Sequence, residues 1–347
     1  MVVTVMRPVL RFAWLPLALL PLLPLGVAQA ATPAPLRIGG SSTVFPVMQA
    51  AIQAYQKAGA NRQVRFELKE TGTSAGFRQF CSGQLYLANA SRPISAKELK
   101  ACAAKGVRFL ELPIGFDAIT VVVNPKNTWA SRITTAELSR LWSQAAAGKV
   151  TRWSQVNLDW PDRPIRLCGP GKDSGTFDYF NKAINGNDKN SRADVFTSEN
   201  DNDLVTCVAG NPDALGYFGY AYFQANSKRL KALSVVGGKG LAYPSPLSVQ
   251  NESYVPLSRP LFIYVNDQAL RSQPELRKFV TYTIQNGLKL VKQAGYIPMP
   301  SSTYRLVESK LYRHVLGSAF GGDLPVGLTT GQALQRSLDS IKKPEFR

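Results

Sequence analysis

Short apolar segments alternate with segments of helical periodicity along most of this chain. Apolar residues recur at the spacing of a buried helix face over residues 135–142 and 274–293. This alternation is typical of α/β domains, in which helices cover the faces of central sheets. The sequence therefore predicts an α/β fold. The apolar segments of strand length are residues 64–68, 119–123, 165–167 and 261–265.

Two of the apolar segments end in the same dipeptide, at residues 123–124 and 265–266, and a proline precedes each segment. We interpret these segments as the places where the chain crosses between two domains. Residues 31–116 together with 259–347 then form a discontinuous first lobe, and residues 117–258 form an inserted second lobe. A mature chain of about 317 residues suits two domains better than one very large core.

The N-terminus has the layout of a secretory signal. Arg7 and Arg11 precede the apolar residues 12–27, and the small residues 28–30, Ala-Gln-Ala, follow. This order is typical of a signal peptide. We predict cleavage after Ala30 and a periplasmic location. The alternative is a retained membrane anchor, but the apolar stretch is short and prolines interrupt it.

Without that segment the chain has 39 basic and 23 acidic residues, and the excess is uneven. Residues 31–118 together with 259–347 carry a net charge of +13, and residues 119–258 carry +3. Such a surface favours anionic partners, although salt screens the attraction. The basic residues are scattered, so we do not expect nucleic acid as a partner. An adhesion module for anionic envelope polymers is an alternative, and its binding would vanish with added salt.

The chain has four cysteines, which in an exported protein favours disulfide bonds. Their number allows three pairings, and the sequence alone leaves these open. We favour Cys81–Cys102, which would join two predicted helices, and Cys168–Cys207, which would brace a strand before a polar turn. A zinc site is disfavoured, since no C-x-x-C occurs and His314 is the only histidine. We therefore expect neither a metal nor a cofactor.

Three short polar turns each precede a segment of helical spacing. We call residues 41–43 the first turn, residues 72–76 the second turn and residues 173–176 the third turn. A helix N-terminus offers unpaired backbone N–H groups and a partial positive charge, and Ser and Thr hydroxyls add donors. Converged in space, three such turns form a cage for a small oxyanion. Each turn taken alone is explained as well by an ordinary N-cap.

The motifs give little support to enzyme chemistry. A Ser-His-Asp arrangement needs a histidine beside a serine, and His314 has no G-x-S-x-G partner. Residues 171–173, Gly-Lys-Asp, do not match a Walker loop, which argues against nucleotide hydrolysis. Asp201 and Asp203 could exchange protons or bind a metal, but carboxylates two residues apart in a polar loop are more often solvated. We expect a binding protein rather than an enzyme.

Five motifs follow one another in a characteristic order and spacing. They lie at residues 38–46 (IGGSSTVFP), 71–77 (TGTSAGF), 90–94 (ASRPI), 173–177 (DSGTF) and 211–223 (NPDALGYFGYAYF). Over most of the mature chain this set resembles the PstS-type periplasmic phosphate-binding proteins of high-affinity phosphate ABC transporters. The resemblance implies a type II binding-protein fold, with two α/β lobes joined by two hinge strands. That fold fits the discontinuous division into lobes given above.

The same resemblance implies that hydroxyls, backbone N–H groups and one arginine hold a dehydrated phosphate ion. Matching the motifs position by position gives the expected ligands. The implied phosphate-binding residues are Ser42, Thr43, the Val44 amide, Thr73, Ser74, Arg92, Ser174, Gly175 and Thr176.

The charged positions depart from the family pattern. Better-known members place an aspartate where this chain has Arg92, and an arginine where it has Pro170. Arg92 is therefore the expected charged ligand, since a guanidinium matches two phosphate oxygens at once. Its replacement by Ala would then weaken binding by on the order of a few kcal/mol. The alternative role of Arg92 is a salt bridge at the surface or between the lobes.

The missing aspartate also bears on selectivity. A buried carboxylate accepts the proton of hydrogen phosphate and disfavours fully ionised sulfate, because two facing acceptors stay unsatisfied. Asp173, Asp178 or Asp201 could replace it.

We expect a monomer that captures inorganic phosphate by lobe closure and delivers it to an inner-membrane ABC permease. The alternatives are a binding protein for another oxyanion such as sulfate and, less favoured, a secreted phosphoester hydrolase.

Overall fold

The computed structural model describes residues 2–4, 34–59, 63–328 and 330–339. Residues 34–347 form one compact unit, and residues 1–33 form a separate one. The predicted signal peptide lies outside the described residues, apart from residues 2–4. Within the described part of the chain, no helix combines the length and the apolar character that crossing a membrane requires.

The first sheet has five strands in the order β2-β1-β3-β13-β4. Strand β1 runs parallel to β2 and β3, whereas β13 is antiparallel to β3 and β4. Every residue of β4 is buried. The strands of the first sheet are β1 (Leu36–Gly40), β2 (Phe66–Glu70), β3 (Leu87–Ala90), β4 (Phe109–Ala118) and β13 (Ser258–Asn266).

The second sheet has five strands in the order β10-β5-β9-β7-β8, and a smaller third sheet has the order β12-β11-β6. All strands of the second sheet come from residues 120–232, between β4 and β13 in the sequence. The strands of these sheets are β5 (Thr120–Val123), β6 (Arg132–Thr134), β7 (Arg166–Pro170), β8 (Phe196–Ser198), β9 (Ala214–Phe218), β10 (Lys231–Ala232), β11 (Ser234–Gly237) and β12 (Gly240–Ala242).

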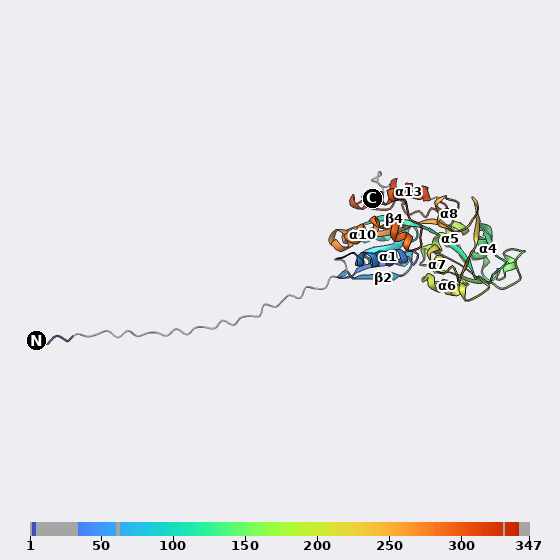
Figure 1. Cartoon of the computed structure of the whole chain (residues 1–347), viewed down its shortest axis with the longest axis horizontal. Helices are drawn as coiled ribbons and strands as arrows, with labels where there is room; N and C mark the ends of the chain where they lie inside the picture. Colours follow the sequence, from blue (N-terminus) through green and yellow to red (C-terminus); the bar gives the residue numbers. More distant parts are fainter. Residues whose placement is uncertain (1, 5–33, 60–62, 329, 340–347) are drawn as a thin grey trace. The chain divides into compact units, whose positions relative to one another are not determined.

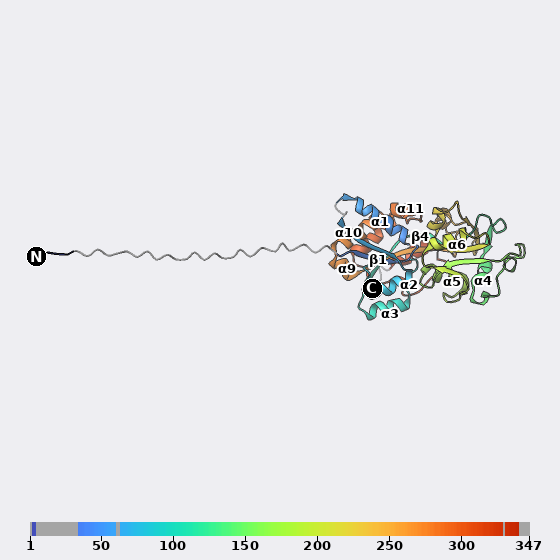
Figure 2. The same ribbon diagram turned by 90° about the horizontal axis from the view of Figure 1, so that it is seen from below.

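Helices surround both large sheets. Within residues 34–347, Figure 1 and Figure 2 both place α1 and α10 with the first sheet, and α4, α5 and α6 with the second. The helices are α1 (Phe45–Lys57), α2 (Thr73–Cys81), α3 (Ala96–Ala104), α4 (Thr135–Trp142), α5 (Gly175–Asn185), α6 (Asp201–Ala209), α7 (Tyr220–Ala225), α8 (Pro246–Gln250), α9 (Asp267–Ser272), α10 (Pro274–Gln285), α11 (Gly287–Gln293), α12 (Ser301–Tyr312) and α13 (Thr330–Asp339).

The predicted α/β architecture is confirmed. All apolar segments of predicted strand length lie in or overlap strands, namely β2, β5, β7 and β13. The predicted helix over residues 274–293 is instead two helices, α10 and α11, which meet at Asn286 and Gly287. A Cβ atom on Gly287 would lie 2.2 Å from the Tyr304 ring, so the close packing of α12 requires glycine at this break.

Two disulfide bonds tie helices to their surroundings. Cys81–Cys102 links the end of α2 to α3, and Cys168–Cys207 links β7 to α6. These are the pairings favoured from the sequence. The second bond fixes the strand that leads into the third turn, so that turn has a rigid base.

Candidate functional site

The three polar turns meet in the interior of the protein. Thr43 Oγ1 in the first turn lies 3.1 Å from Thr176 Oγ1 in the third turn, although 133 positions separate them in the sequence. The Ser74 amide of the second turn donates to the Asp173 carbonyl of the third turn at 2.8 Å. The convergence predicted from the sequence is therefore present in the structure.

The first turn connects β1 to α1. Ser42 is 2% exposed, and its carbonyl accepts a hydrogen bond from the Tyr222 hydroxyl at 2.9 Å. The Val44 amide, an expected phosphate donor, donates to the Ser41 carbonyl at 3.2 Å. Because the Ser42 and Thr43 side chains are buried beside that amide, the turn presents hydroxyl groups to the interior.

The second turn connects β2 to α2. Gly72 has a φ of +81°, and a Cβ atom there would lie 2.5 Å from the Asp173 carbonyl oxygen, so this position requires glycine. The Thr73 hydroxyl lies 3.3 Å from the Ser91 hydroxyl and accepts from the Ser91 amide at 3.2 Å. These bonds place Thr73 at the end of β3, facing the third turn.

The third turn connects β7 to α5. The Ser174 hydroxyl accepts from the Thr176 amide at 3.1 Å, which is an N-cap bond. A Cβ atom on Gly175 would lie 2.6 Å from Thr73 Oγ1 and 2.7 Å from Ser91 Oγ. The third turn therefore approaches the second as closely as glycine allows.

An arginine that the sequence analysis missed lies at this junction. Arg259 in β13 is 1% exposed, and its Nη2 donates to Thr176 Oγ1 at 2.8 Å and to Thr43 Oγ1 at 3.4 Å. Its Nη1 donates to the Ser91 carbonyl at 3.0 Å. The Asp117 carboxylate accepts from Nη2 at 2.8 Å and from Nε at 3.1 Å. A buried guanidinium thus contacts the first and third turns together.

Arg92, the arginine expected at the site, has a different set of partners. Its Nε donates to Asp178 at 2.7 Å, and Nη1 and Nη2 each donate to Glu98 at 2.8 Å. Nη1 also donates to the Pro93 carbonyl and Nη2 to the Ser74 hydroxyl. A guanidinium has five N–H donors. All of them therefore have protein acceptors among the described residues.

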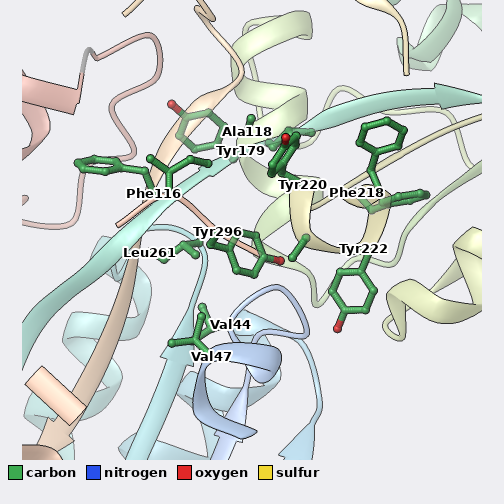
Figure 3. Packing of buried hydrophobic residues seen from close by; sticks show 14 of the residues in the cluster. Val44, Val47, Phe116, Ala118, Tyr179, Phe218, Tyr220, Tyr222, Leu261 and Tyr296 are labelled. Atoms are coloured by element: carbon green, nitrogen blue, oxygen red, sulfur yellow. The ribbon is translucent and has the colours of Figure 1, made fainter. Parts of the chain in front are cut away.

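Acidic and phenolic groups surround the junction. The Tyr222 hydroxyl lies 3.4 Å from a Glu70 oxygen, and burial raises the pKa of Glu70. In the close-up of Figure 3, the Tyr296 ring lies between Val44 and Tyr222, and all three residues belong to one buried cluster. Water is thus largely excluded around the first turn.

Asp173, Asp178 and Asp201 are the carboxylates that could replace the missing family aspartate, and they differ in their hydrogen-bond partners. Asp173 accepts two bonds from Arg78, and Asp178 accepts one from Arg92. Asp201, the first residue of α6, is 1% exposed, and neither carboxylate oxygen has a hydrogen-bond partner among the described residues. Burial raises its pKa to about 8; the Arg259 charge opposes this rise and Asp117 adds to it.

Replacing Asp201 by Asn is expected to stabilise the fold at alkaline pH. The folded protein keeps the Asp201 proton up to about pH 8, whereas the unfolded chain releases it near the ordinary pKa of 3.8. The free energy of unfolding therefore falls as the pH rises from about 4 to about 8. Asparagine does not titrate, so the variant should be more stable than the unmodified protein at pH 8 by on the order of a few kcal/mol. Urea unfolding of both proteins at pH 5 and pH 8 measures the difference.

The matched control is Asp159→Asn, at an exposed position. It should leave the pH dependence of unfolding unchanged. An Asp201→Asn variant with the same pH dependence as the unmodified protein would contradict the assignment of the raised pKa to Asp201.

Comparison with known proteins adds to this geometry. The model of the PBP superfamily domain matches residues 26–286. The chain is 43% identical to Protein SphX of Synechocystis sp., over 92% of this chain and 95% of that protein. It is 32% identical to the phosphate-binding protein PstS of Staphylococcus epidermidis, over 77% of this chain and 79% of that protein. The chain belongs to the family of PstS-type phosphate-binding proteins.

A solved structure of the family extends this likeness to the fold. A putative phosphate ABC transporter substrate-binding protein with bound phosphate from Clostridium perfringens is 25% identical, with a TM-score of 0.65. The alignment covers 77% of this chain and 100% of that one. The fold is that of a type II periplasmic binding protein, and PstS-type proteins are solute-binding proteins rather than enzymes.

Proposed function

We propose that this protein binds inorganic phosphate where the three turns meet and delivers it to an ABC permease. The observation that carries the proposal is the buried junction of Thr43, Thr73, Thr176 and Arg259. Hydroxyl groups can turn toward a ligand, and a shielded guanidinium stabilises an anion strongly. The relatives named phosphate-binding proteins support phosphate as the ligand.

The ligand set includes Arg259 in place of Arg92. Two contacts of Arg259 are to threonine hydroxyls on the first and third turns, so a phosphate ion between these turns would be within its reach. All donors of Arg92 already have carboxylate, hydroxyl or carbonyl partners. The remaining ligands are those expected from the motifs, namely Ser42, Thr43, the Val44 amide, Thr73, Ser74, Ser174, Gly175 and Thr176.

Asp201 is assigned to discrimination between phosphate and sulfate. It is a buried carboxylate close enough to Arg259 to feel its charge, and it lacks a hydrogen-bond partner among the described residues. Because the folded protein keeps the Asp201 proton up to about pH 8, this discrimination is expected above that pH, where the ionised carboxylate accepts the proton of hydrogen phosphate and sulfate has no proton to donate.

The division into lobes 31–116 plus 259–347 and 117–258 is part of the proposal. The two large sheets draw their strands from these ranges with small shifts at the crossings, which supports it. Closure of the lobes would then bring the third turn onto the first two. We also propose an exported, monomeric protein, with a signal peptide cleaved after Ala30, that hands phosphate to an inner-membrane permease.

Titration calorimetry tests the proposal. We expect saturable binding of one phosphate per chain, weaker binding of sulfate, and no turnover of a chromogenic phosphate ester. Above about pH 8, Asp201→Asn should reduce the preference for phosphate. Tight sulfate binding without phosphate binding would overturn the assignment, and so would ester turnover. Binding that disappears with added salt would support the adhesion module instead.

A further inference from the structure

Two arginines beside the second turn pair with two acids of the segment that begins at the third turn. Arg78 of α2 donates to Asp173 through Nη1 at 2.7 Å and Nη2 at 2.8 Å. Arg92, which follows β3, donates to Asp178 of α5 at 2.7 Å. A backbone bond from Ser74 to Asp173 lies at the same seam.

These ion pairs connect elements that belong to different sheets. Helix α2 and strand β3 flank or form the first sheet, since β3 pairs with β1 and β13. Helix α5 follows β7, a strand of the second sheet. No covalent neighbour ties the two sides together here, because about 80 residues separate Arg92 from the third turn. The two ion pairs and the backbone bond from Ser74 to Asp173 therefore join the two sides at this seam.

We propose that Arg92 and Asp178, with the outer pair Arg78 and Asp173, form a latch that favours the closed arrangement of the two lobes whether or not phosphate is bound. This proposal rests on the proposed function, which includes closure of the two lobes on phosphate. Arg92 is then a positioning residue, because it acts on phosphate through Asp178 of α5, the helix that begins in the third turn. Its full set of protein acceptors leaves it this role rather than direct contact.

The two ion pairs differ in how strongly they stabilise the closed arrangement. The Arg92 side chain is 5% exposed and that of Asp178 16%, so this pair is largely shielded from solvent. Glu98, at 12%, holds Arg92 from the other side and fixes its orientation. The Arg78 and Asp173 side chains are 62% and 37% exposed, and exposed pairs contribute little. The inner pair is therefore the main part of the latch.

The two possible roles of Arg92, as part of the latch or as a phosphate ligand, predict opposite effects of Asp178→Asn on phosphate affinity. If Arg92 bound phosphate, Asp178→Asn would remove a competing anion, and phosphate affinity would stay the same or rise. If the pair holds the lobes together, the same substitution populates the open arrangement. Affinity then falls, because only the closed fraction of the protein grips the ion.

The experiment compares Asp178→Asn, Arg92→Gln and the double variant with the unmodified protein. We expect each single variant to weaken phosphate binding about tenfold, and the double variant to be no weaker than the singles. The phosphate dissociation rate should rise in each. Small-angle X-ray scattering of the phosphate-free variants should give a larger radius of gyration. Should Arg92→Gln fail to fold, Asp178→Asn alone shows whether phosphate affinity falls, as the latch predicts, or stays the same or rises.

The matched control is Arg163→Gln, in an ion pair with Asp213 whose partners both lie between β4 and β13 in the sequence. It should leave phosphate affinity and scattering unchanged. Unchanged or tighter binding by Asp178→Asn would overturn the latch. If the unmodified protein binds no phosphate, the proposed function fails, whereas the scattering comparison without phosphate still decides the latch.

Discussion

Replacing Arg259 by Gln together with Asp117 by Asn is expected to weaken phosphate binding about 100-fold, because the anion loses charge-assisted hydrogen bonds from a shielded guanidinium. The two side chains are fully buried and pair with each other at 2.8 Å. Removing Arg259 alone would leave the Asp117 charge buried without its partner, which destabilises folds strongly. The double variant removes both charges, and its new side-chain amide oxygen can still accept from the Tyr220 amide, as the Asp117 carboxylate does at 2.9 Å.

Calorimetric titration measures this loss, and thermal unfolding checks that the variant folds. Arg259→Lys gives a second measurement that keeps the charge but loses the planar fork of donors. The control is Arg163→Gln with Asp213→Asn, a partly exposed ion pair that includes no residue of the three turns. Phosphate affinity equal to that of the unmodified protein in both Arg259 variants would place the charged ligand elsewhere.

Replacing Gly175 by Ala is expected to weaken phosphate binding roughly 10- to 100-fold through steric conflict. The added Cβ atom would lie 2.6 Å from Thr73 Oγ1, 2.7 Å from Ser91 Oγ and 3.0 Å from Thr73 Cβ. Thr73 and Ser91 are buried, so they have little room to give way. The third turn must then move outward, while α5 itself tolerates alanine at its first residue.

Gly238→Ala is the matched control, because a Cβ atom there meets nothing within 4 Å. Its phosphate affinity should equal that of the unmodified protein. The decisive comparison is calorimetric titration of the two variants after both have been shown to unfold at similar temperatures. If Gly175→Ala bound phosphate normally, close contact of the second and third turns would not be needed for binding.

Local sequence patterns predicted segments of strands β2, β5, β7 and β13 and the helix α4, because the periodicity of buried residues is a local property. The helix over residues 135–142 and the strand segments illustrate this, since α4 has the predicted bounds. The break between α10 and α11 was missed, although Asn286-Gly287 at the break is a dipeptide that marks turns. What the local sequence could not show is the close contact of Gly287 with the ring of Tyr304, from a helix further along the chain. Such packing has no signal within the segment itself.

The turns of the candidate site were predictable, but the proposed charged ligand, Arg259, was not. Each turn has its own hydroxyls and glycines next to a helical pattern, so each could be found locally. Arg259 lies 216 positions from Thr43 and 83 from Thr176, and only the fold brings them together. One signal was available: Arg259 is the single charge in the apolar strand β13, and the pairing of β13 with β4 sets it directly opposite Asp117.

The ligand role of Arg92 stays a prediction. It was expected because a guanidinium can hold two phosphate oxygens, although better-known members of the family have an aspartate at this position. In the structure its guanidinium donates to Glu98, which lies six positions further along the chain. That carboxylate also closes the N-terminal capping box of α3 with Ser95. Glu98 is a carboxylate that competes with phosphate for Arg92, and its position in the sequence was a local signal. It favours the alternative role of Arg92, a salt bridge.

A crystal structure of the protein grown with phosphate would locate the ion. We expect density for one tetrahedral ion in contact with the hydroxyls of Thr43, Thr73 and Thr176 and with the guanidinium of Arg259. In the same crystal, Arg92 should keep its bonds to Glu98 and Asp178. Phosphate bound against Arg92 instead, or no ion at the junction of the three turns, would contradict this expectation.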